Sequence, residues 1–373
     1  MRISELDGLR GWAALSVVLF HLFWESFGGI IPAYRSFFVN GLINGQTAIA
    51  IFFLVSGAAL SAPFHMGRGQ NYLISAAIRR HLRLALPILA AALLVYLLFH
   101  LHLMKGPEAS VFVKREDWRG LNWVADVTLK NVFYFSFAGV FAPTQIQSDM
   151  VPFLWTMAIE FAGSIILFLA LFCSDAMRNP GMAFLVAGCF LLVVFPSLAC
   201  FFFGSLIVER RIKQENHFVL DHPIIGVLSI LGLYIFSCAA LAYAIPAVDQ
   251  IRTVVCALVL YQALNFRPFR KFLSTNRISI FLGRISFPIF LTHFAVIGAF
   301  MAPLIIRFHD HLGPKTTFAI GVVTAMACVG VARAFLPIER IGHIASGKFT
   351  EWVVRPHTNS IGQSAAAPNN MSS

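Results

Sequence analysis

Charged side chains are scarce in this chain. They make up 12% of the 373 residues, whereas apolar side chains make up 58% and the mean hydropathy is +0.77. A soluble globular domain carries about 25% charged residues, so this composition excludes that class of protein. Several nearly uncharged runs reach about 20 residues, which is long enough to cross the hydrocarbon core of a bilayer. Because backbone polar groups at that depth must be satisfied internally, we expect these runs to be helices.

Cysteine is also rare, with six residues that all fall in or at the ends of apolar runs. Neither a CxxC pair nor a Cys/His spacing typical of a metal site occurs, so the sequence predicts no disulfide framework and no bound metal. The features of a cleavable signal peptide are missing as well, because Glu5 and Asp7 precede the first apolar run and no small-residue cleavage site follows it cleanly. We therefore expect this run to remain as a membrane anchor.

The apolar runs predict an all-α polytopic membrane protein with about ten transmembrane helices. The runs cover residues 9–27, 44–64, 84–104, 151–172, 182–196, 197–209, 223–244, 248–265, 279–301 and 315–336. The two runs around Pro196 fit either one long kinked helix or a short hairpin, because proline permits a break. The aromatic stretch 131–142 fits either an interfacial or a re-entrant segment.

The distribution of basic residues predicts the topology. With the N-terminus inside, eighteen lysines and arginines fall on the cytoplasmic side and nine fall outside, five of these in the loop 105–150. The positive-inside rule therefore places both termini in the cytoplasm. We expect residues 1–340 to form one membrane domain and residues 341–373 a cytoplasmic tail that is disordered from about Ser360.

Arg10 and His21 lie eleven residues apart in the first apolar run. On an α-helix this spacing returns to within about 20° of the same face, roughly 16 Å further along the axis. An ionisable side chain inside a bilayer is costly and indicates a functional site, although a buried histidine bonded to another helix is the simpler alternative. Glu25 lies one turn beyond His21 and either orients the imidazole or is a solvated residue at the helix end.

Two later runs also carry ionisable residues at membrane depth. Glu160 lies about ten residues into its run and forms a polar stripe at one-turn spacing with Thr156 and Ser164. A carboxylate in this environment needs a partner. His293 is a second intramembrane histidine, in a run that Pro288 is expected to kink.

Two shorter patterns have a functional and a structural interpretation. Arg80 and Arg83 are three residues apart at the expected cytoplasmic start of the third span, where arginine forks suit phosphate but equally suit lipid headgroups. Ser56 and Gly57 let helices approach closely and place a hydroxyl at the interface, which helix packing alone also explains. Acyl transfer from a phosphate-bearing donor would account for the arginines, the histidines and the glutamate together.

The motifs also resemble a known family, acyltransferase family 3. The similarity rests on Arg10-x10-His21, FFLVSG at 52–57, RHLR at 80–83, WTMAIEF at 155–161, FFFGSL at 201–206 and GRISFPIFLTH at 283–293, which occur in the family's order between about residues 3 and 340. These proteins are integral-membrane enzymes that move acyl groups, usually from coenzyme A, onto extracytoplasmic carbohydrates.

The resemblance implies roles for particular residues. It implies catalytic roles for His21, Glu160 and His293, donor binding by Arg10, Arg80 and Arg83, substrate contacts by Trp155 and Ser56, and a closing glutamate, Glu339, after the last helix. His21 would act as a general base or as a transient acyl carrier, and Glu160 would position His21 or bind the acceptor. Thr156 stands where the family usually has serine.

The sequence therefore predicts an O-acyltransferase of the bacterial inner membrane. Its donor would be cytoplasmic acyl-CoA, most simply acetyl-CoA, and its acceptor a hydroxyl of an extracytoplasmic or lipid-linked glycan. Membrane lipid and polysaccharide-assembly proteins are expected partners, and nucleic acid is not. The alternative is a proton-coupled transporter, which also uses buried His and Glu residues, but transporters more often show an internal repeat, and none stands out.

Overall fold

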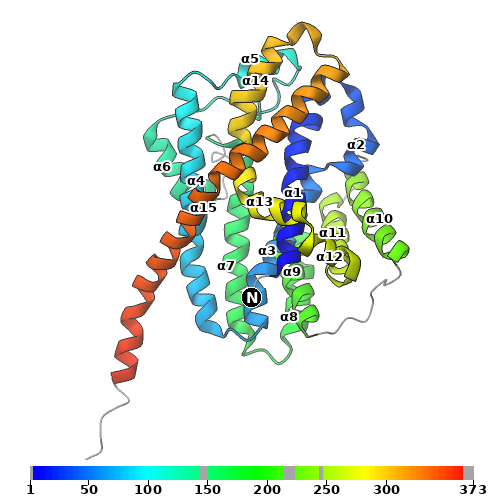
Figure 1. The fold of residues 1–373 in the computed structure, drawn as a ribbon. Helices are drawn as coiled ribbons and strands as arrows, with labels where there is room; N and C mark the ends of the chain where they lie inside the picture. Colours follow the sequence, from blue (N-terminus) through cyan, green and yellow to red (C-terminus); the bar gives the residue numbers. More distant parts are fainter. Residues whose placement is uncertain (1–2, 143–149, 214–222, 243–246, 364–373) are drawn as a thin grey trace, which may run out of the picture.

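The computed structural model describes residues 3–142, 150–213, 223–242 and 247–363, and this part of the chain is helical and holds no strand (Figure 1). The helices are α1 (Ser4–Leu19), α2 (Phe37–Leu42), α3 (Gly45–His65), α4 (Gln70–His100), α5 (Gly106–Phe112), α6 (Leu129–Phe137), α7 (Thr156–Ser174), α8 (Pro180–Val194), α9 (Pro196–Ile212), α10 (Pro223–Ala242), α11 (Val248–Asn265), α12 (Arg267–Thr275), α13 (Arg277–Val296), α14 (Ala302–Arg307) and α15 (Pro314–Gln363).

Six helical segments in the described residues are long and apolar enough to cross a membrane. They are Ser4–Gly29, Phe37–His65, Gln70–His100, Pro152–Ser174, Arg277–Arg307 and Pro314–Val353. The prediction of an all-helical polytopic protein is confirmed, whereas the count of ten spans and the cytoplasmic placement of the termini stay predictions. The first and fifth segments contain π-helical turns, at Phe20–Ser26 and Ile297–Met301.

The region around Pro196 forms a hairpin and not one kinked helix. Helix α8 ends before Phe195 and α9 begins after it, because the Phe195 backbone is not helical (φ −143°, ψ 79°). The rings of Phe184 and Phe202 pack at 5.4 Å between centroids. With 15 and 17 residues, each arm is shorter than the roughly 20 residues that a spanning helix needs. Within the stretch 131–142, α6 ends at Phe137, and its nine residues are also too few to span.

Two predicted spans are longer than the hydrophobic runs indicated. Helix α4 begins at Gln70, so Arg80 and Arg83 lie inside it and not at its cytoplasmic start. Helix α15 continues to Gln363 and runs diagonally across the bundle, with its far end beyond the other helices (Figure 1). Glu339 therefore lies within α15, and the prediction that it follows the last helix is wrong. The last predicted disordered residues, 364–373, lie outside the described residues.

Glycines set the closest helix contacts. A Cβ at Gly57 of α3 would lie 2.2 Å from the Phe201 carbonyl oxygen, and one at Gly204 of α9 would lie 2.0 Å from that of Leu54. Such small residues let helix backbones approach closely. Ser56-Gly57 and FFFGSL are thus the two sides of one α3–α9 contact.

A second glycine contact sets the register of α1 against α13. A Cβ at Gly11 would lie 2.4 Å from the Gly283 backbone nitrogen, and one at Gly283 would lie 2.7 Å from the Asp7 carbonyl oxygen. His21 and His293 each follow their glycine by ten residues. Because the imidazoles also meet, as described below, α1 and α13 run parallel and stay in contact along about 15 Å.

We expect Gly11→Ala to reduce the free energy of unfolding by about 1–3 kcal/mol, because the added methyl group must push α1 away from α13. Gly330→Ala in α15 is the matched control, since its Cβ would meet nothing within 4 Å. That change replaces glycine by the better helix former and is expected to be neutral or stabilising. Thermal unfolding of both variants in one detergent checks this. A Gly11→Ala protein as stable as the wild type would contradict the close α1–α13 contact.

Candidate functional site

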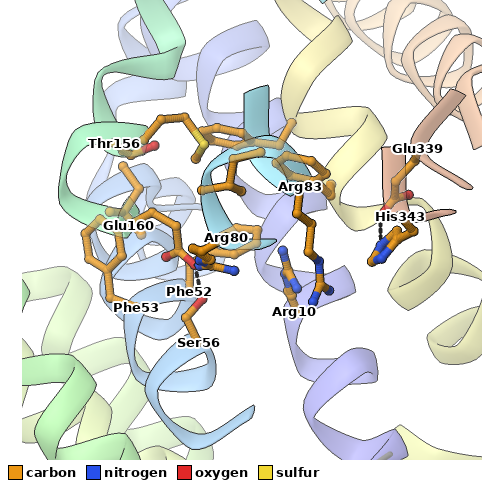
Figure 2. Close-up of a pocket in the computed structure, with 15 residues that line it drawn as sticks. Arg10, Phe52, Phe53, Ser56, Arg80, Arg83, Thr156, Glu160, Glu339 and His343 are labelled. Carbon is orange, nitrogen blue, oxygen red and sulfur yellow. Dashed lines mark hydrogen bonds and ion pairs between the residues drawn. The ribbon is translucent and has the colours of Figure 1, made fainter. Parts of the chain in front are cut away.

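An arginine-lined cavity lies where α1, α3, α4, α7, α13 and α15 meet (Figure 2). Its polar lining residues are Arg10, Ser56, Arg80, Arg83, Thr156, Glu160, Glu339 and His343, and its apolar lining includes Phe52, Leu84, Met157 and Phe290. Figure 2 shows the side chains of Arg10 and Arg83 next to each other, with Arg80 and Glu160 on one side and Glu339 and His343 on the other. Five residues predicted to act at the site therefore line one cavity, namely Arg10, Ser56, Arg80, Arg83 and Glu160.

Arg80 and Glu160 form a buried ion pair across this cavity. Arg80 is 6% exposed and Glu160 is 8% exposed, and the Nη2 atom of Arg80 lies 2.5 Å from Oε1 of Glu160. The same carboxylate oxygen accepts a hydrogen bond of 2.8 Å from the Ser56 hydroxyl, and the Nε–H of Arg80 donates to Ser164 Oγ over 3.0 Å. Charges this far from water require such partners. Arg80 is thus the partner that we expected for a carboxylate at the position of Glu160.

This ion pair bears on one of the two interpretations of the RHLR motif, the binding of lipid headgroups. Arg80 is not a surface residue for lipid headgroups, because it is buried and bonded to Glu160 and Ser164. Glu160 contacts Arg80 and Ser56, and among the described contacts it has none with His21. The structure thus gives no direct contact through which Glu160 would position His21, and the ring that His21 contacts belongs to another residue.

Arg10 and Arg83 are the cations that face the cavity from the side of Glu339. The Nε of Arg10 is buried and has no hydrogen-bond partner among the described residues. Glu339 lies 3.7 Å from Nε2 of His343, one turn further along α15. A guanidinium with an unused, buried donor is suited to an anionic group that enters the cavity.

A wider cleft continues from the cavity toward the start of α1. The two share Arg10, Arg83, Phe287, Glu339 and His343, and the cleft adds Ile3, Leu6, Asp7, Arg284 and Arg340 among its lining residues. Its lining thus contains four arginines against the carboxylates of Asp7 and Glu339. A passage with this excess of positive charge favours a ligand with several phosphate groups.

The two intramembrane histidines contact each other further along α1 and α13. The Nδ1 atom of His21 and the Nε2 atom of His293 are 3.1 Å apart, and Nδ1 of His293 lies 3.0 Å from the Ile289 carbonyl oxygen. The Phe153 ring stacks on both imidazoles, with centroid distances of 4.0 Å to His21 and 4.7 Å to His293. His21 lies in the π-helical turn Phe20–Ser26, a local geometry that is frequent at functional sites.

The arginine cavity and the histidine pair adjoin at one ring. Phe290 lines the cavity, and its ring centroid is 5.9 Å from that of His293, one turn further along α13. The Phe52 ring packs against Phe290 from α3 at 6.0 Å. A ligand bound to the arginines can therefore extend along this apolar wall toward the histidines.

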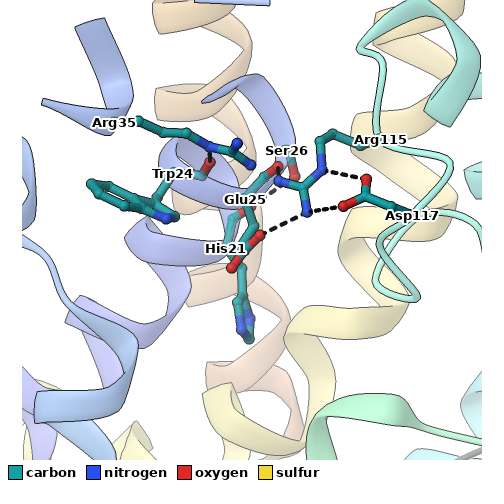
Figure 3. A network of polar contacts seen from close by, with 7 residues as sticks. All are labelled: His21, Trp24, Glu25, Ser26, Arg35, Arg115 and Asp117. Carbon is teal, nitrogen blue, oxygen red and sulfur yellow. Dashed lines mark hydrogen bonds and ion pairs between the residues drawn. The ribbon is translucent and has the colours of Figure 1, made fainter. Parts of the chain in front are cut away.

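Glu25 does not pair with His21. Its carboxylate lies 3.0 Å from Nη2 of Arg115, and Arg115 also donates to the Glu25 carbonyl oxygen and to both carboxylate oxygens of Asp117 (Figure 3). The alternative that Glu25 orients His21 was therefore wrong. As for the other alternative, its side chain is 21% exposed at the helix end, but it is paired with Arg115. Arg115 ties the loop after α5 to the π-helical turn, and this loop brings the Trp118 ring to 5.7 Å from His21.

Several site residues were not predicted from the sequence. Phe153, Trp118 and Arg115 surround the histidine pair, but they come from segments that carry no motif. Trp155, which was predicted to contact substrate, is 45% exposed and lines neither the cavity nor the histidine pair among the described contacts. The aromatic enrichment near residues 118 and 153 is the signal that could have pointed to this wall.

Comparison with known proteins agrees with these observations. A family model described as an acyltransferase domain matches residues 3–334. The chain is also similar to an O-acetyltransferase, PaAT-1 from Phomopsis amygdali, with 26% identity over 377 residues that cover 84% of this chain and 76% of the relative. No solved structure matches the chain.

Proposed function

Because the chain belongs to the acyltransferase 3 family and is an acyltransferase, we propose that it transfers an acetyl group from cytoplasmic acetyl-CoA to a hydroxyl of a carbohydrate acceptor across the membrane. The observation that carries this proposal is the placement of two sites on one helix. Arg10 of α1 lines the arginine cavity, and His21, eleven residues further on in the π-helical turn that continues α1, lies beside His293. On a helix the two positions are roughly 16 Å apart.

The donor half of the site follows from the charges of the cavity. Arg10 and Arg83, together with Arg284 and Arg340 of the adjoining cleft, bind the phosphate groups of the donor. The acyl arm extends past the apolar side chains of Phe52 and Phe290 toward His21. Arg80 takes a smaller part in phosphate binding, since its charge is already paired with Glu160.

His21 acts as general base in the transfer. It takes the proton of the acceptor hydroxyl while the hydroxyl oxygen attacks the thioester carbonyl carbon. The new C–O bond forms as the C–S bond breaks, and coenzyme A leaves as a thiol after receiving the proton from His21. A nucleophile and its base must lie within hydrogen-bond reach, so the acceptor hydroxyl binds directly beside the imidazole.

The acceptor reaches His21 from the side of Trp118. A flat aromatic side chain next to the base suits the apolar face of a sugar ring, which supports a carbohydrate or a lipid-linked saccharide as the acceptor. Such an enzyme works in the membrane that separates the cytoplasmic donor from the exported acceptor. In a bacterium this is the inner membrane. Proteins that assemble the acceptor polysaccharide are then its natural partners.

The test is acetyl transfer by the purified full-length protein in lipid nanodiscs, with acetyl-CoA and a panel of soluble and lipid-linked saccharides. We expect free thiol and an acetylated saccharide to appear together. Arg83→Gln should raise KM for acetyl-CoA roughly 10-fold or more, since a hydrogen bond to a charged group contributes about 1.5–3 kcal/mol. The exposed Arg178→Gln is the control and should leave KM unchanged. Absence of both thiol release and acetyl-CoA binding would contradict the proposal.

A further inference from the structure

We propose that His293 is a positioning residue that fixes the tautomer of His21, so that Nε2 of His21 receives the proton of the acceptor hydroxyl. This inference rests on the proposed function, because it assigns an atom and a second residue to the proton transfer of that reaction. The sequence had predicted a catalytic role for His293. The contacts of the two rings give them different roles.

The first observation is the difference in exposure. The His293 side chain is completely buried, with 0% exposure, whereas His21 retains partial exposure. Phe153 covers the face of the His293 ring, and Phe290 and Phe294 flank Phe153 and His293 at ring distances of 5.3–5.9 Å. A group without accessible surface cannot touch an acceptor, so only His21 can take its proton.

The second observation is the direction of the hydrogen bonds. A carbonyl oxygen only accepts, so the contact of 3.0 Å between Ile289 O and Nδ1 of His293 places a hydrogen on that nitrogen. In the neutral imidazole the other nitrogen, Nε2, then carries a lone pair. This lone pair accepts from Nδ1 of His21 at 3.1 Å, so Nδ1 of His21 carries its hydrogen and its Nε2 is the unprotonated atom.

The surroundings favour the neutral form of both rings before substrate binds. Among the described residues, no ion pair joins a carboxylate to either imidazole, and the carboxylates of Glu160 and Glu25 are paired with Arg80 and Arg115. A buried imidazolium without a counter-charge is costly. The hydrogen bonds from Ile289 through His293 to His21 therefore resemble those of other proton-transfer sites, in which a second group orients the base. Here His21 is the base and His293 is the group that orients it.

The Phe153 ring keeps the two imidazoles in this geometry. It stacks on His21 with an angle of 29° between planes and on His293 with an angle of 17°, and the two imidazoles are within 14° of parallel. Stacked aromatic faces restrict the rotation of each ring about its side-chain bonds. Nε2 of His21 consequently keeps a fixed direction.

The test compares His293→Leu with His293→Gln in the acetyl-transfer assay. Leucine removes the acceptor for Nδ1 of His21, and we expect kcat to fall about 100-fold while KM for acetyl-CoA stays unchanged. Glutamine places an amide oxygen near the position of Nε2, and we expect it to restore kcat to within about 10-fold of the wild type. Equal losses in the two variants, or wild-type kcat in His293→Leu, would overturn the inference.

A second measurement does not depend on activity. In ¹⁵N-histidine-labelled wild-type protein, we expect the two rings to give the chemical shifts of Nδ1–H tautomers, with the signals assigned by their loss in His21→Ala and His293→Gln. An Nε2–H tautomer of His293 overturns the inference even if acetyl transfer occurs. Wild-type protein that transfers no acetyl group contradicts the proposed function instead, so the two failures are distinct.

Discussion

Replacing His21 with alanine is expected to reduce kcat for acetyl transfer by about 100-fold to 10,000-fold, the range typical of a lost general base. His21→Gln should lose as much, because an amide cannot accept and hold a proton at neutral pH. KM for acetyl-CoA should change little, since the donor is bound by the arginines of the cavity, of which Arg10 lies about three helical turns before His21. The assay is thiol release together with mass spectrometry of the acetylated acceptor.

The controls for this experiment come from the same chain. His309→Ala removes an imidazole that is exposed at the far end of α14, and it should leave kcat unchanged. Thermal unfolding of His21→Ala should remain close to that of the wild type, which separates lost chemistry from lost folding. A His21→Ala protein with more than a tenth of wild-type kcat would show that another group accepts the proton.

The second large effect concerns stability. Glu160→Leu should lower the free energy of unfolding by about 3–5 kcal/mol, because it leaves the buried guanidinium of Arg80 without a counter-charge. The double variant Arg80→Met with Glu160→Leu removes both charges and should recover most of this loss, since an apolar pair of similar volume is often tolerated at a buried ion pair. Denaturant or thermal unfolding in detergent measures all three proteins.

The matched control is the exposed pair of Lys105 and Glu108. Its carboxylate lies 3.0 Å from the ammonium and is 60% exposed, so Glu108→Leu should change the free energy of unfolding by less than about 1 kcal/mol. A Glu160→Leu protein of wild-type stability that transfers no acetyl group would contradict this structural role. Such a result would instead support the catalytic role that the WTMAIEF motif implies for Glu160.

The sequence predicted those features of the site that one helix determines. The 3.6-residue period places Arg10 and His21 on one face of α1, and Thr156, Glu160 and Ser164 in one stripe of α7. The stripe of α7 holds in the structure, where Glu160 and Ser164 both contact Arg80. The first relation is modified, because His21 lies in the π-helical turn that follows α1. The existence of a partner for Glu160 could also be predicted, since a buried carboxylate needs one.

The identity of the partners could not be predicted in this way. Glu160 is 80 residues from Arg80, His21 is 272 residues from His293, and Glu25 is 90 residues from Arg115. Which side chains meet at such separations depends on how the helices pack, and that is set by backbone contacts such as the one between Gly11 and Gly283. A single sequence shows where the small residues lie along the chain, but it does not show which of them contact each other in the folded protein.

The length of α4 was underestimated for a related reason. Hydropathy assigned its arginine-rich first turns to the aqueous side, whereas the ion pair with Glu160 allows Arg80 to lie inside the bundle. A hydropathy scale treats each charge as if it were alone. It therefore misplaces a helix boundary wherever two charges compensate each other in the folded protein.

The pairing of α1 with α13 has a consequence for biosynthesis. The ribosome makes His21 near the start of the chain and His293 more than 270 residues later, and their helices are in contact along about 15 Å in the finished protein. During translation α1 is therefore inserted before α13 has been made. Until α13 packs beside it, Arg10 and His21 lack the contacts that they have in the folded protein. Enzyme activity should thus arise only after α13 has been inserted, and chains that end before α13 should be inactive. Their unpaired polar groups in the membrane should also make such chains targets for degradation.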